Sequence, residues 1–202
     1  TSPPLQVVAL DSCPARTDAE VVDMIQRNAV ALRDHPKFAQ AVLVVIVECN
    51  MGYTIADRVR GMLSRPDMRP ILILSRDPGK KGRAGIWTGE TEKTLYATAL
   101  ERILANNALA RAETLVSPPS ADPQRAERHW DELLKQLATF RRIVHQPTDE
   151  AFQKFRVTLP GKGGGAKDDL VLALQMALFW GDDVRRDPMF LTMAEQAHWQ
   201  LV

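Results

Sequence analysis

The chain has 202 residues, of which 45% are hydrophobic and 25% charged, a balance that excludes a disordered protein and fits one domain over residues 1–202. The formal net charge is +1, so no global basic field attracts nucleic acid, and any such binding must use local patches. The two cysteines, Cys13 and Cys49, form no disulfide framework and favour a reducing compartment inside a cell. The longest apolar run, Ala41 to Val47, is too short to span a bilayer, so no membrane partner is expected.

The first half of the chain alternates short apolar segments with amphipathic ones. Strands are expected at Leu5–Leu10, Ala41–Val47 and Pro70–Leu74. Between them, Thr17 and Glu20 have the spacing of a capping box that begins a helix, and Thr54 is expected to cap a second helix. Strands and helices that alternate at this pace predict an α/β fold with parallel strand pairs.

The second half of the chain should be richer in helices. Helices are expected from about Glu90 to Asn106, from Asp122 to about Ala138, from Asp168 to about Trp180, and briefly after Pro188. In the first of these, Leu100, Ile103 and Leu104 should face inward. Two further segments, Phe140–Val144 and Phe155–Leu159, could pair as strands.

The pair Asp168–Asp169 is the most informative feature, because it follows the glycine loop 161–167 and opens an apolar helix. Adjacent carboxylates repel each other and resist burial, a cost that falls when they bind a divalent cation. Glu48 ends the strand 41–47, and a strand end can meet a helix start at one edge of a sheet. Glu48, Asp168 and Asp169 therefore predict a magnesium or manganese site.

Each of these acids also has a simpler explanation. Asp168 could be the N-cap of the helix, and Asp169 could complement the helix dipole in the first turn. Glu48 could merely end its strand, as acids often do. The glycine loop is no Walker A motif, because Asp168 follows Lys167 where that motif needs Ser or Thr, so nucleotide hydrolysis is not expected here.

Two loops carry cations that could contact a DNA backbone. The cations are Arg76, Lys80, Lys81 and Arg83 after the third strand, and Lys162 and Lys167 in the glycine loop. Loops that follow the carboxyl ends of parallel strands are where α/β folds bind ligands, and cations there suit phosphates. The alternatives are a solvated charge run and a flexible connector.

Other catalytic chemistries find little support. The four histidines, His35, His129, His145 and His198, are scattered, and none has zinc-ligand spacing from another histidine or a cysteine. Ser12 and Ser75 have no base nearby in the sequence, so no hydrolase triad is predicted.

Three segments resemble the nuclease domain of viral large terminases. Residues 45–50, followed by a helix, resemble the second acidic motif of that family, and residues 167–174 resemble the third. Between them, Gly85–Thr88, which comes before a helix, resembles the region of the family that follows the third of the expected strands. The similarity runs from about Leu5 to Trp180 and is closest to tailed-phage and herpesvirus terminases.

The resemblance implies a ribonuclease H-like fold, with a mixed central sheet flanked by helices. It implies an endonuclease that cuts concatemeric double-stranded viral DNA during genome packaging, with two Mg²⁺ or Mn²⁺ ions. Glu48, Asp168 and Asp169 would be both metal ligands and catalytic residues. Other terminase subunits and the portal would be partners, in the host nucleus for a herpesvirus-like protein and in the host cytoplasm for a phage-like one.

One departure from the family pattern matters. The family has an aspartate on the first strand of its fold, whereas the first strand here is expected to correspond to the third. The missing acid would lie upstream of Thr1, or Asp11 would substitute for it as a metal ligand. Two alternatives therefore stay open: a different ribonuclease H-like nuclease, such as a resolvase, and a catalytically inactive DNA-binding or assembly module of a packaging machine.

Overall fold

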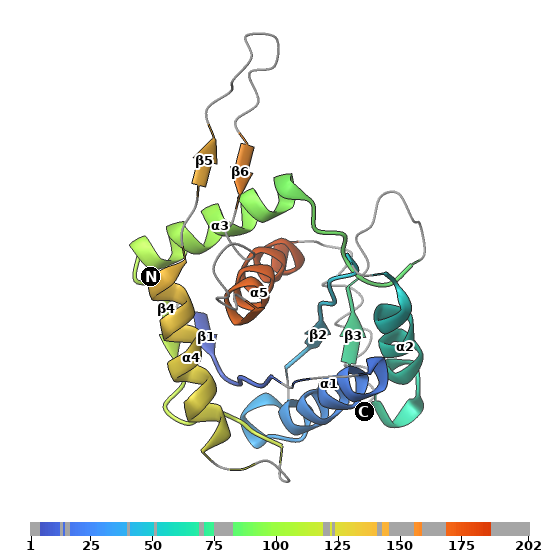
Figure 1. Ribbon diagram of the computed structural model, residues 1–202. Helices are drawn as coiled ribbons and strands as arrows, with labels where there is room; N and C mark the ends of the chain where they lie inside the picture. Colours follow the sequence, from blue (N-terminus) through green and yellow to red (C-terminus); the bar gives the residue numbers. More distant parts are fainter. Residues whose placement is uncertain are drawn as a thin grey trace.

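The computed structural model is mixed α/β, as the sequence predicts, with strands and helices alternating along the chain (Figure 1). The structure describes residues 5–12, 14, 17–39, 41–50, 52–68, 71–74, 83–118, 122, 124–140, 143–145, 156–158 and 169–186. For 143–145, 156–158 and 183–186 it describes the backbone alone. No helix in these ranges is both long and apolar enough to cross a membrane.

The described residues form five α-helices, two short 3-10 helices (Pro36–Phe38 and Pro66–Met68) and six strands. The strands are β1 (Leu5–Val7), β2 (Leu43–Val45), β3 (Ile71–Ile73), β4 (Leu109–Arg111), β5 (Ile143–His145) and β6 (Arg156–Thr158). The helices are α1 (Asp18–Arg33), α2 (Thr54–Leu63), α3 (Glu90–Ala105), α4 (Arg125–Thr139) and α5 (Asp169–Arg186). In Figure 1, α5 lies in the middle of the view, with the other four helices around it and the β5–β6 pair projecting away.

The strands pair in three separate two-stranded sheets. β1 is parallel to β4, β2 is parallel to β3, and β5 is antiparallel to β6. The parallel pairs and the β5–β6 pair follow the sequence prediction, although β4 was not anticipated. The single central sheet that the family resemblance implies is not formed by the described strands.

Local sequence signals explain most of the helix boundaries. At the start of α1, the Glu20 amide donates to Thr17 Oγ1 and the Thr17 amide donates to Glu20 Oε2, so the predicted capping box is confirmed. Thr54 is instead the first residue of α2, after Tyr53, and the expected cap there was wrong. Leu104 is also wrongly expected inside: it is 44% exposed and lies in the last turn of α3, which ends at Ala105.

Two apolar clusters hold the helices in place. One packs α1 and α2 against β2 and β3, and includes Val47, Val59 and Met62. The other buries one face of α5 against α3, α4 and β1. Its buried members are Val7, Leu100, Ile103, Leu133, Leu170, Val171, Leu174 and Leu178. The opposite face of α5 points toward β2, and there the candidate site lies.

Candidate functional site

Glu48 lies three residues after the end of β2 and is held there by an isolated backbone bridge to Ile86, in the segment before α3. The Ile86 amide donates to the Val47 carbonyl, and the Cys49 amide donates to the Ile86 carbonyl, both at 2.9 Å. Val47 and Cys49 are buried, on the side that packs against α2. Because successive side chains of a strand point to opposite faces, Glu48 points away from them, toward α5.

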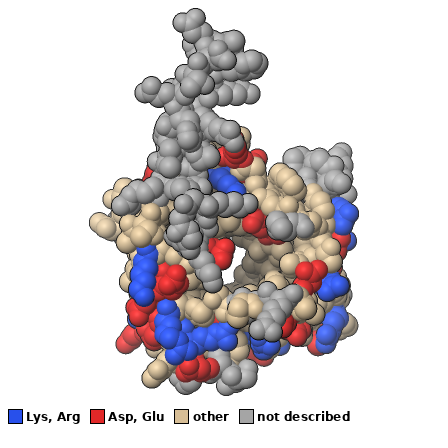
Figure 2. Space-filling view, in the orientation of Figure 1, with Lys and Arg blue, Asp and Glu red and all other residues tan. Residues whose placement is uncertain are grey.

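A pocket of about 390 Å³ separates β2 from α5. Its lining residues are Val44, Ile46 and Glu48 from the β2 segment, and Asp169, Leu172, Ala173, Met176 and Ala177 from α5. Figure 2 shows this face hollowed near its middle, with acidic atoms at the margin of the hollow. Two of the three predicted ligands, Glu48 and Asp169, therefore face one pocket, while Asp168 lies outside the described residues.

The acids differ in their surroundings. Asp169 is exposed, whereas Oε1 of Glu48 is buried and has no hydrogen-bond partner among the described residues. A buried oxygen without a partner is costly, and a cation would offset that cost. Carboxylate oxygens are the donors that hard divalent cations prefer, so the residues present fit magnesium or manganese. In the described ranges no three His, Cys, Asp or Glu side chains gather into a complete metal cluster.

A buried tyrosine of α3 lies within the influence of the Glu48 charge. The indole Nε1 of Trp180 donates to Oη of Tyr96 at 2.8 Å. Burial raises the pKa of Tyr96, the hydrogen bond from Trp180 opposes the rise, and the charges of Glu92 and Glu48 add to it. Tyr96 therefore stays a neutral phenol near the Glu48 carboxylate.

The backbone next to the site is fixed by an amide side chain. Nδ2 of Asn50 donates to the Thr88 carbonyl and Oδ1 of Asn50 accepts from the Thr88 amide, both at 2.7 Å. This two-bond contact joins the segment that follows Glu48 to the one that begins α3. It holds Glu48 and Tyr96 in a fixed relation, since Tyr96 lies on α3.

The first turn of α5 is fixed from α4. Oε1 of Gln136 accepts from the Leu170 amide at 3.1 Å and from the Val171 amide at 3.3 Å. Gln136 is 7% exposed. The residue thus sets where α5 begins and where Asp169 stands.

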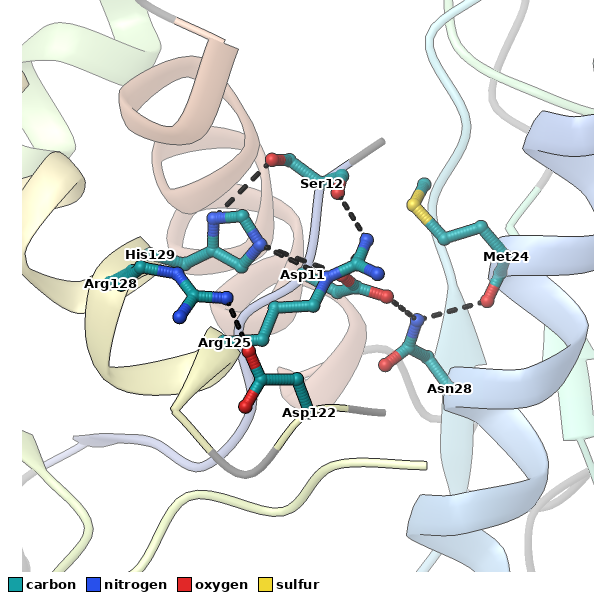
Figure 3. Close-up of polar contacts among 8 residues, drawn as sticks. All are labelled: Asp11, Ser12, Met24, Asn28, Asp122, Arg125, Arg128 and His129. Carbon is teal, nitrogen blue, oxygen red and sulfur yellow. Dashed lines mark hydrogen bonds and ion pairs between the residues drawn. The ribbon is translucent and has the colours of Figure 1, made fainter. Parts of the chain in front are cut away.

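Asp11, the alternative first acid, has a different place (Figure 3). Its Oδ1 forms a 2.7 Å ion pair with Arg125, and its Oδ2 accepts from Nδ2 of Asn28 at 2.8 Å. These bonds tie the segment after β1 to α4 and α1. Asp11 is not among the residues that line the pocket of Glu48 and Asp169, so the structure does not bring it to the candidate site.

Ser12 and His129 also lie together, next to Asp11 (Figure 3). Oγ of Ser12 is 3.4 Å from Nδ1 of His129, and Nε2 of that ring is 3.4 Å from Nε of Arg125 and 3.6 Å from Oδ1 of Asp11. The sequence shows no base near Ser12, because the packing of α4 on the segment after β1 brings His129 there from a distant part of the chain.

Of the predicted DNA-binding cations, the structure describes Arg83. Its guanidinium forms an ion pair with Asp57 of α2, and its central carbon lies 4.5 Å from the centroid of the Tyr53 ring. The side chain remains 42% exposed. The others, Arg76, Lys80, Lys81, Lys162 and Lys167, lie outside the described residues.

Gln136 and Tyr96 do not stand out in the sequence. Their partners, Leu170, Val171 and Trp180, are distant along the chain, so no local pattern marks them. Comparisons of the chain with protein-family models, with curated proteins and with solved structures give no match.

Proposed function

We propose that this chain is the nuclease domain of a viral large terminase, with a ribonuclease H-like fold. It would cut concatemeric double-stranded DNA during genome packaging. The observation that supports this most is that Glu48 and Asp169, each taken from a sequence motif, line one pocket of about 390 Å³ between β2 and α5. The motifs are a property of the sequence, whereas the pocket results from how β2 and α5 pack together. The resemblance and the shared pocket are therefore independent observations.

Glu48 and Asp169 would hold Mg²⁺ or Mn²⁺, with Asp168 as a third ligand by resemblance. Bound there, such ions lower the pKa of a water and stabilise the leaving oxygen of a phosphodiester. Glu48 offers a buried oxygen that needs a positive partner. Asp169 is exposed, so its side of the pocket is open to a DNA strand. Tyr96 and the Asn50–Thr88 contact keep the Glu48 side rigid.

The substrate would be recognised through its phosphates. The net charge of +1 supplies no global attraction, so the cationic loops 76–83 and 162–167 would supply it locally. Other terminase subunits and the portal would be partners. The site of action would be the host nucleus or the host cytoplasm, according to the type of virus.

Nicking of supercoiled plasmid in MnCl₂ or MgCl₂ tests the proposal. The wild type should nick, and Glu48→Gln or Asp169→Asn should each lower the rate by about 100-fold or more, since metal stabilisation of the reaction amounts to several kcal/mol. Glu113→Gln, which changes an exposed carboxylate after β4, is the matched control and should keep full activity. Circular dichroism would verify that each variant folds. Full nicking by both site variants would refute the proposal.

One observation favours a rival function. The described residues bring two carboxylates to the pocket, whereas the resemblance implies three or four ligands. A catalytically inactive DNA-binding or assembly module would bind duplex DNA and leave it uncut in either metal. A resolvase-like nuclease would instead cut a four-way junction in preference to the linear duplex. The same assay, run on plasmid, duplex and junction, separates the three.

A further inference from the structure

We infer that a second pocket, beside the C-terminal half of α1, binds a small molecule that joins an apolar body to a negatively charged group. The pocket has a volume of about 530 Å³. It shares no lining residue with the pocket of Glu48 and Asp169. The inference is therefore independent of the proposed function and would stand if that function failed.

This second pocket, the α1 pocket, lies between α1, the short helix Pro36–Phe38 and the segment after β4, and its walls are mostly apolar. Val30 of α1 also packs against the cluster that joins α1 and α2, and the Val116 amide donates to the Val8 carbonyl at 2.7 Å. Both walls are thus held in place. A preformed, mostly apolar pocket of roughly 300–1,000 Å³ with a few polar groups is typical of small-molecule sites. The apolar lining residues are Val30, Ala31, Pro36, Val116 and Pro118.

Arg27 gives the α1 pocket a positive charge that is not matched within the described part of the chain. The residue is exposed, and no hydrogen bond or ion pair joins it to another described residue. The carboxylate in the lining, Asp34, is already paired, because Nε of Arg33 lies 2.7 Å from its Oδ1 and Nη2 of Arg33 lies 3.2 Å from its Oδ2. This contact with Arg33 holds the pKa of Asp34 below its usual value. The charge left over in the pocket is that of Arg27.

His35 supplies a second donor to the α1 pocket. The Lys37 amide donates to Nδ1 of His35 at 3.2 Å. Since a backbone amide can only donate, Nδ1 is the acceptor, and the neutral ring carries its proton on Nε2. Among the described residues none accepts that proton. The ring also lies against Phe38, with centroids 5.3 Å apart, so its orientation is fixed.

These polar groups decide the charge of the ligand. Arg27 and His35 offer donors that lack acceptors, while the remaining polar side chains of the lining, Gln26 and Ser117, are neutral. A guanidinium binds a carboxylate or a phosphate through two parallel N–H bonds, and the apolar walls would cover the rest of the molecule. In the pocket of Glu48 the unmatched group is a buried oxygen, which favours a cation instead. The ligand of the α1 pocket is therefore an organic acid or a phosphate ester with an apolar body.

Fluorescence titration with two matched dyes tests the inference. Anilinonaphthalene sulfonate has a negative group on an apolar body, and phenylnaphthylamine has the same body without the sulfonate. EDTA in every titration prevents divalent cations from binding the sulfonate elsewhere. Arg27→Gln should weaken binding of the sulfonate dye by about 10-fold, the contribution of one hydrogen bond to a charged group, and leave binding of the neutral dye unchanged.

Two further variants locate the dye and control for charge. Ala31→Trp should abolish binding of both dyes, because the indole fills the pocket; Ser117→Trp fills it from the opposite wall and replaces that variant if it does not fold. Arg58→Gln removes an exposed arginine of α2 outside the α1 pocket and should change neither affinity.

Three results would overturn the inference. If the wild type binds neither dye, or if the tryptophan variants bind both dyes as the wild type does, the α1 pocket is not the site. If Arg27→Gln weakens the two dyes equally, or no more than Arg58→Gln does, the pocket does not select a negative charge. None of these results bears on the nicking of plasmid, which tests the proposed function separately.

Discussion

The hydrogen bond from Trp180 to Tyr96 joins α5 to α3 on the inner side of the candidate site. The two rings meet edge to face, with centroids 6.5 Å apart and planes at 68°. Trp180 also packs against Leu74, whose amide donates to the Val45 carbonyl, and against Ile86, whose backbone pairs with Val47 and Cys49. One aromatic side chain thus ties together the elements that carry Glu48 and Asp169.

Trp180→Phe should destabilise the protein by about 1–2 kcal/mol, since it removes the donor to a fully buried tyrosine hydroxyl. Urea denaturation measures this. Trp87→Phe is the matched control, because Trp87 is 50% exposed and should change stability far less. A cycle with Tyr96→Phe should yield a coupling of about 1 kcal/mol. Additive losses would mean that the hydrogen bond contributes nothing.

Two glycines should respond to alanine with opposite signs. Gly85 has φ +95°, and a Cβ there would lie 3.0 Å from Cβ of Ala56 and 3.1 Å from the Val47 carbonyl oxygen. Gly85→Ala should therefore cost more than about 1 kcal/mol and disturb the pairing that holds Glu48. Gly61 lies within α2 with nothing near its missing Cβ, so Gly61→Ala should stabilise by about 0.5–1 kcal/mol. Thermal melts of both would show whether this contrast exists.

Sequence patterns predicted what is encoded locally. The capping box of Thr17 and Glu20, the strand before Glu48 and the helix that begins at Asp169 all follow from residues within a few positions. The Gln136 cap and the Trp180–Tyr96 bond could not be predicted, because each joins elements that only the packing of α5 brings together. Asp11 illustrates the same limit.

For Asp11, the sequence shows an acid at a strand end, and the ion pair with Arg125 appears only when α4 is placed. Asp11→Ala should lower stability by about 1–3 kcal/mol, since Arg125 and Asn28 each lose one of their acceptors. Mn²⁺ affinity should not change, because Asp11 does not line the pocket. Asp122→Asn, at an exposed pair with Arg128, is the control and should shift Tm much less. Loss of Mn²⁺ binding by a folded Asp11→Ala would instead make Asp11 a ligand.

His129 should make stability depend on pH. Burial lowers the pKa of His129 below its ordinary 6.5, against the opposing effect of Asp11. As pH falls through 6.5, His129 takes up a proton in the unfolded chain before it does so in the folded one. The contribution of His129 to the free energy of unfolding is therefore fully present above that pH and declines below it, until the folded ring is also protonated. The slope is at most about 1.4 kcal/mol per pH unit for one proton. The test is to measure the free energy of unfolding at about pH 7.5 and about pH 5.5, on either side of the ordinary histidine pKa. Between these pH values His129→Gln should lose less stability than the wild type. An equal loss in both proteins would assign the effect to other groups.

DNA binding should depend on the cations of loop 76–83, but not equally on each. Arg83 is already paired with Asp57 and stacked on Tyr53, so part of its charge is matched within the protein. Lys80→Ala with Lys81→Ala should weaken binding uniformly across DNA sequences, because phosphate contacts carry no base information. The dependence of affinity on salt should flatten by roughly one unit of slope for each phosphate that is no longer neutralised. Arg83→Ala should flatten it less and should also lower Tm, since Asp57 is deprived of an ion-pair partner.

Titration of labelled duplexes at several salt concentrations would separate these effects. Lys37→Ala with Lys135→Ala removes the same number of charges from exposed positions elsewhere on the surface, and is the matched control. It should lower affinity only slightly and leave the salt slope unchanged, because distant exposed charges are screened. Equal slopes for the loop pair and the control pair would show that loop 76–83 is solvated and does not contact DNA. If Arg83→Ala alone lowers the salt slope by a full unit, Arg83 leaves Asp57 and pairs with a phosphate when DNA binds.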